Sequence, residues 1–209
     1  MALPPLVTAT LQAALLGALS NVLAQLLAAR GTTESTTKAG DNSVDWIPVL
    51  QFLLFSIVST PPNFLWQEFL ESTYPAHPRK NDKSLSIYNT IAKFVLDQTV
   101  GAVVNTLLFS LFIHALQDAM ASAPRIASLP AAVAYLARPG AVDLARVDTA
   151  AVVEAARRDF WPVVVAGLKV WPAVSLLNFT VVKTVPARNL VGALAGVAWG
   201  IYMSTMAAQ

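Results

Sequence analysis

The sequence contains no cysteine, only two histidines and few charged residues. Without cysteine the chain forms no disulfide, no cysteine-ligated zinc site and no thiol nucleophile. With His77 and His114 as the only histidines, and no His-Glu-x-x-His pattern, a histidine-based metal site is not expected. The sequence also lacks a Gly-x-Ser-x-Gly elbow and a glycine-rich phosphate loop. We therefore expect no enzymatic activity, no cofactor and no metal.

Charge is scarce as well. Charged residues make up 12% of the chain, whereas a typical soluble domain has about 25%. Hydrophobic residues make up 56%, and the mean hydropathy is +0.57. A net charge of +2, spread along the chain, is too small to indicate a nucleic-acid partner. This composition is typical of an integral membrane protein whose main partner is the lipid bilayer.

Long apolar runs are what the sequence does have. Each is about 20 residues or longer, which as a helix matches a hydrocarbon core of about 30 Å. We predict an all-α integral membrane protein, a bundle of four to five kinked transmembrane helices in a single membrane domain over residues 1–209. Polar loops are expected at about 30–45, 68–86 and 119–159, and a C-terminal hairpin over 160–208. The apolar segments are 6–29, 46–67, 87–116, 160–182 and 189–208.

Prolines punctuate two of these segments. Pro61 and Pro62 lie deep inside the second segment, and adjacent prolines remove two backbone donors, which predicts a kink or a break. Pro172 lies well inside the fourth segment and predicts another kink. Asp148 is a suitable N-cap for a helix that leads into that fourth segment.

Polar side chains recur on two of the predicted membrane helices. Thr10, Gly17, Asn21 and Gln25 in the first segment share one helical face, which either packs against other helices or lines a pore. In the third segment Asp97 and Asn105 fall at helical spacing, with Gly101 between them, and predict a second polar face.

Asp97 and Lys169 are charged residues inside predicted spans. An intramembrane carboxylate is costly, so Asp97 needs a partner, a proton or water. Antiparallel succession of the helices places it on the same membrane side as Lys183 and Arg188, so Arg188 or Lys183 is the expected partner. Asp97 then either forms a structural pair or contacts a permeating solute. Lys169 in the fourth segment either extends to the surface, pairs with a polar neighbour or faces an aqueous path.

Small residues recur on the last segment, where Gly192, Gly196 and Gly200 follow one another at four-residue spacing. In an apolar helix this spacing favours close contact with another helix. The contact lies either within the chain or between copies in a homo-oligomer.

Several short motifs, in one order along the chain, resemble the 22-kilodalton peroxisomal membrane protein family, which includes the Mpv-seventeen protein of the inner mitochondrial membrane. Asp97 and Gln98 match its Asp-Gln motif on an earlier span, and the runs at 59–78 and 97–110 look most like its fungal branch. Its C-terminal signature is matched by Trp171, Pro172, Asn178, Phe179, Val185, Pro186, Arg188, Trp199, Tyr202, Met203 and Ser204.

The resemblance implies a function. Relatives are described as non-selective or weakly selective channels for small solutes in peroxisomal or inner mitochondrial membranes. The likeness to the fungal branch implies the peroxisomal membrane here, with the inner mitochondrial membrane as the alternative. The chain also departs from the family pattern: it has Gly167 and Leu168 in place of Asn-Trp, Ser175 in place of Gln, and Ala102 or Val103 in place of a Pro.

Two functions follow as hypotheses. In the first, the polar faces line a hydrated path through the helix bundle. In the second, the protein does not conduct and organises other membrane proteins through residues 119–159 and the glycine row. For a pore, the predicted polar residues are Asp97, Gln98, Asn105, Lys169, Asn178 and Arg188.

Overall fold

The computed structural model describes residues 3–32, 43–77 and 84–207, except for the side chains of residues 30–32 and 203–207. Parts of two predicted polar loops, 33–42 and 78–83, and the end of the predicted hairpin at residue 208 lie outside this description. Within the described ranges the chain is helical and contains no strand.

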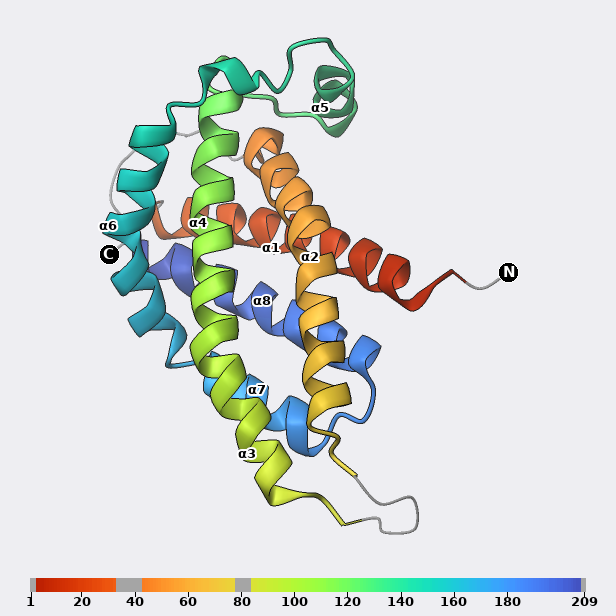
Figure 1. Ribbon diagram of the computed structural model, residues 1–209. Helices are drawn as coiled ribbons and strands as arrows, with labels where there is room; N and C mark the ends of the chain where they lie inside the picture. The colour runs from red at the N-terminus through yellow and green to blue at the C-terminus, as the bar shows by residue number, and fades with distance from the viewer. Residues whose placement is uncertain (1–2, 33–42, 78–83, 208–209) are drawn as a thin grey trace.

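The helices form a bundle with two crossing layers (Figure 1). The long α3–α4 rod packs between α2 and α6, and α1 and α8 lie together behind them, with α1 also packed on α2. The helices are α1 (Pro5–Thr32), α2 (Trp46–Thr73), α3 (Ile87–Leu96), α4 (Ala102–Ala119), α5 (Leu129–Leu136), α6 (Thr149–Gly167), α7 (Trp171–Thr180) and α8 (Val185–Ala207). Two short turns complete the elements, the π-helical η1 (Asp97–Gly101) and the 3-10 helix η2 (Leu144–Arg146).

Three to four of these elements are long and apolar enough to cross a membrane. They are α1, α2 and the α3–α4 rod, with α6 and α7 as the fourth if that bent pair is one span. The predicted all-α membrane fold is therefore confirmed. The fifth predicted segment is the 23-residue α8, whose first turns carry the polar Arg188 and Asn189.

α2 continues without a break through Pro61 and Pro62, so the break allowed by the prediction does not occur. Its start at Trp46 is as predicted, and the side chain of Asp45 caps it by accepting the backbone N–H of Ile47. Its end differs: α2 extends to Thr73, six residues into the region predicted as a polar loop from residue 68. Glu71 is consequently a helical residue.

The rod formed by α3, η1 and α4 contains one π-helical turn at Asp97–Gly101. A π turn takes up one residue more than an α turn, so it rotates the residues that follow. Asn105 is exposed, whereas Asp97 points toward α2 and α7. The predicted face shared by Asp97 and Asn105 is therefore wrong, because it assumed an uninterrupted 3.6-residue period.

The fourth predicted segment bends by 56° between α6 and α7. Asp148 caps α6 through the N–H groups of Ala150 and Ala151, as predicted. The bend follows the end of α6 at Gly167, and Pro172 occupies the first turn of α7, where its missing N–H costs no hydrogen bond. Lys169 lies in the bend itself.

Residues 120–148, here called the cap, fold back onto the ends of α2 and α4. Ala132 and Tyr135 of α5 are buried in a hydrophobic cluster with Ile47, Leu50 and Leu116. The Tyr135 hydroxyl donates to the carbonyl of Ala141 at 2.9 Å, and the N–H of Trp46 donates to Ile126 O at 2.9 Å. The cap, which is most of the predicted polar region 119–159, is therefore packed against the ends of α2 and α4.

Candidate functional site

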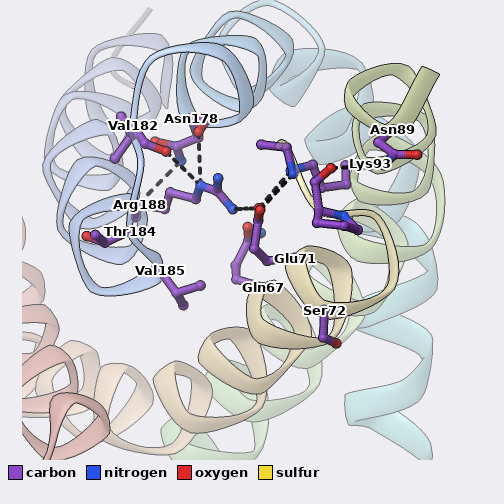
Figure 2. A network of polar contacts seen from close by, with 12 residues as sticks. Gln67, Glu71, Ser72, Asn89, Lys93, Asn178, Val182, Thr184, Val185 and Arg188 are labelled. Atoms are coloured by element: carbon purple, nitrogen blue, oxygen red, sulfur yellow. Dashed lines mark hydrogen bonds and ion pairs between the residues drawn. The ribbon is translucent and has the colours of Figure 1, made fainter. Parts of the chain in front are cut away.

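The centre of the site is Glu71, near the end of α2, which bridges two cations from other helices. Glu71 Oε2 lies 2.7 Å from Lys93 Nζ of α3 and 2.6 Å from Arg188 Nη1 of α8 (Figure 2). Glu71 Oε1 accepts the backbone N–H of Ala76. The Lys93 and Arg188 side chains are 0% and 1% exposed, and that of Glu71 is 28% exposed. These three residues, the charged centre, join three helices.

The guanidinium of Arg188 is held on several sides. Its Nε donates to the carbonyls of Asn178 and Val182, both at 3.0 Å, and Asn178 Nδ2 donates back to Arg188 O. The Phe179 ring lies 5.4 Å from Arg188 Cζ and 5.3 Å from Lys93 Nζ, within reach of cation–π attraction. The basic connection between α7 and α8, residues 183–188 and here called the elbow, is thus hydrogen-bonded through Arg188 to the C-terminal end of α7.

Asp97 forms a second polar cluster, here called the Asp97 cluster, which includes Trp66, Gln67 and Ser175. Its Oδ1 accepts Gln67 Nε2 at 3.0 Å and Trp66 Nε1 at 3.2 Å, and its Oδ2 accepts Ser175 Oγ at 2.8 Å. A Cβ atom on Gly101 would stand 2.9 Å from Trp66 Nε1, so a glycine is needed for the indole to reach the carboxylate.

The predicted pairing of Asp97 with Arg188 is wrong. Arg188 pairs with Glu71, and the described partners of Asp97 are neutral donors. The prediction failed because Glu71 was assigned to a loop, which removed it as a competing carboxylate. Lys183, the other proposed partner, is exposed.

Gln67 lies on α2 between the Asp97 cluster and the charged centre. It donates to Asp97 and lies one helical turn before Glu71 on α2. Within the described part of the chain, three buried side-chain oxygens lack a hydrogen-bond partner: Gln67 Oε1, Thr90 Oγ1 and Asn178 Oδ1. Buried polar atoms of this kind are normally satisfied by protein or by ordered water.

The other predicted polar residues lie elsewhere. Gln98 follows Asp97 in the π turn and is half-buried, and Asn105 faces outward. Lys169 is at the surface of the bundle, where its Nζ donates to the Tyr202 hydroxyl at 3.2 Å and lies 5.9 Å from that ring. Of the predicted pore residues, Asn178 and Arg188 meet at the charged centre.

The motif aromatics gather beside the bend. Trp171 lies 6.3 Å from Trp199 between ring centroids, and Trp199 lies 5.6 Å from Tyr202. Phe179 is buried against the charged centre. Pro186 is in the first turn of α8, where proline is tolerated.

Four site residues were missed by the sequence prediction: Trp66, Gln67, Glu71 and Lys93. Gln67 and Glu71 are four residues apart and follow the apolar run directly, so a helix continued by one turn aligns them. Glu71 lies near the end of α2 and Lys93 in the last turn of α3, and opposite charges on the two sides of the predicted loop 68–86 were the available signal.

The site is built from carboxylate, cationic and amide side chains. Among the described residues, no three His, Asp or Glu side chains come together where they could hold a metal ion. The arrangement instead places ionised groups and amides in contact within a helix bundle. Such groups can bind water or a small polar or charged solute.

Two comparisons with known proteins found similar sequences. Residues 144–204 match the Mpv17 / PMP22 family model. Over 206 residues the chain is 26% identical to PXMP2/4 family protein 3 of Dictyostelium discoideum, covering 98% of this chain and 85% of the relative. No solved structure matches. Neither comparison tests the closer likeness to the fungal branch. The predicted resemblance is confirmed, and the chain is an all-helical, multi-pass membrane protein that carries the Mpv17 / PMP22 signature in its C-terminal part.

Proposed function

We propose that the protein is a weakly selective pore for small solutes in an organelle membrane and has no enzymatic activity. The observation that carries this proposal is the run of ionisable and amide side chains, from Asp97 through Gln67 to Glu71, inside helices long enough to span a bilayer. Such groups in membrane segments usually serve a solute or ion pathway. The family resemblance supports the same function.

The proposed compartment rests on the resemblance alone. We propose the peroxisomal membrane, with the inner mitochondrial membrane as the alternative, because relatives occupy both.

A second candidate, a non-conducting organiser, is favoured by α8. A Cβ atom on Gly192 or Gly196 would meet nothing within 4 Å, so this part of the glycine row is open to a partner helix. Gly200 is different, because its added Cβ would clash with Ser20 Oγ of α1. Only the first two glycines are therefore available for a homo-oligomer.

Single-channel recording of the purified full-length protein in planar bilayers tests the first function. Discrete currents, altered in conductance or selectivity by Asp97→Asn, are expected of a pore that passes this cluster. Lys169→Gln is the comparison, because Lys169 contacts Tyr202 away from both centres. A silent bilayer containing protein shown to be inserted would refute conduction and favour the organiser.

A further inference from the structure

The charged centre contains more positive than negative charge. Lys93 and Arg188 contribute two cations, whereas Glu71 is the carboxylate that contacts them. Asp97 does not offset the excess by direct contact, since its described hydrogen bonds come from Trp66, Gln67 and Ser175. Two nearly inaccessible cations therefore share one carboxylate oxygen.

The cations keep spare donors. A lysine ammonium has three N–H groups and an arginine guanidinium has five. In the described contacts Glu71 takes one from each, and two carbonyls share the Arg188 Nε–H. The remaining N–H groups are suited to an anion.

The three unpaired acceptors come from three helices: Gln67 of α2, Thr90 of α3 and Asn178 of α7, each more than 90% buried. Gln67 lies one turn from Glu71, Thr90 one turn from Lys93, and Asn178 contacts Arg188. Figure 2 shows Gln67 and Asn178 directed toward the charged centre from different helices. The two amide oxygens need O–H or N–H donors, and the Thr90 hydroxyl needs a partner of either kind, which the described side chains do not supply.

From this combination we infer that the charged centre is a binding site for small hydrated anions and makes the pore anion-preferring. The spare N–H groups of Lys93 and Arg188 contact the anion, and its hydration waters donate to the three acceptors. Access is past Glu71, the most exposed member of the centre. Chloride and the carboxylate or phosphate of a small metabolite share this chemistry. The inference rests on the proposed pore function.

The test is the reversal potential of the full-length protein in planar bilayers under a KCl gradient. Native channels are expected to reverse toward the chloride equilibrium potential. Lys93→Gln leaves Glu71 paired with Arg188. It should lower the chloride-to-potassium permeability ratio by roughly tenfold, because a charge in a low-dielectric cleft raises the local counter-ion concentration by about tenfold or more. Lys183→Gln, an identical charge change at an exposed residue of the elbow, should leave the ratio near native.

Replacing chloride with acetate or phosphate then shows which class of anion permeates. The channel current persists with a permeating anion and falls with one that does not permeate. Silent native protein refutes the proposed function itself. Native channels that conduct but prefer potassium, or a Lys93→Gln channel indistinguishable from Lys183→Gln, overturn the anion site alone. If Lys93→Gln does not insert, the native reversal potential still decides.

Discussion

Arg188 is the residue with the most demanding geometry. Its planar fork reaches Glu71 with one nitrogen and two backbone carbonyls with another, while its face lies near Phe179. A lysine offers a single point of charge and cannot reproduce this set of directions. The shape of the guanidinium, as well as its charge, therefore joins α8 to α2 and α7.

Arg188→Gln should destabilise the protein by about 1 to 3 kcal/mol, because the carbonyls of Asn178 and Val182 lose their buried donor, while Glu71 keeps its pairing with Lys93. Arg188→Lys should restore only part of this loss. Thermal unfolding in detergent, followed by circular dichroism, measures both. Lys183→Gln is the control, and an unfolding temperature for Arg188→Gln equal to that control would contradict the role given to the pair.

Gly101 acts through the space it leaves. Gly101→Val should push the Trp66 indole from the Asp97 carboxylate and destabilise the protein by about 1 to 3 kcal/mol, as overpacking does. Tryptophan fluorescence should change together with stability. Gly192→Val is the matched control, since its side chain meets open space. Equal effects of the two substitutions would show that Gly101 has no special spatial role.

At the scale of the elements, α8 uses its small residues in two ways. Gly200 lets α1 approach through Ser20, and Gly192 and Gly196 face open space. The three glycines share one four-residue spacing but have two environments, a helix contact at Gly200 and open space at Gly192 and Gly196. The spacing alone does not distinguish these environments.

Gly200→Leu should loosen the α1–α8 contact and lower the unfolding temperature of the monomer. Gly196→Leu should leave the monomer stable, and it should reduce self-association if copies meet through this face. Thermal unfolding and the mass of the detergent-solubilised particle, determined by light scattering, measure the two effects. A larger thermal loss for Gly196→Leu than for Gly200→Leu would contradict this division.

The helices were predictable because apolar length reports directly on membrane spans, and Asp148 and Trp46 marked two starts correctly. The site was less predictable. Two acidic residues lowered the hydropathy at the end of α2, so Glu71 was placed in a loop. The π turn at Asp97 has no clear sequence signal, and it moved Asn105 off the predicted face.

At the scale of the whole molecule, the cap closes the end of the bundle opposite the charged centre (Figure 1). It is held by its own cluster around Ala132 and Tyr135 and by backbone hydrogen bonds to the start of α2 (Trp46 N–H to Ile126 O) and the end of α4 (Asp143 N–H to Ala119 O). Because these contacts are separate from Glu71 and Arg188, the two ends are expected to respond independently to substitution.

Tyr135→Ala should expose the cap to limited proteolysis, with a loss of about 3 to 5 kcal/mol for a large buried ring. Tyr135→Phe, which removes the hydrogen bond to Ala141, should cost only about 1 kcal/mol. Neither should change the ion selectivity of channels. A selectivity change in Tyr135→Phe would show that the two ends are coupled.

The pairing of α1 with α8 bears on how the protein is made. α1 is synthesised well before α8 and packs against it, and Arg188, one of the two partners of Glu71, also lies on α8. Until α8 is synthesised, α1 therefore lies in the membrane without α8, and Glu71 of α2 lies there without Arg188. A chain cut short before residue 185 keeps its earlier spans and the pairing of Glu71 with Lys93, but it lacks Arg188 and leaves the α8-facing side of α1 uncovered, a feature that membrane quality control can recognise.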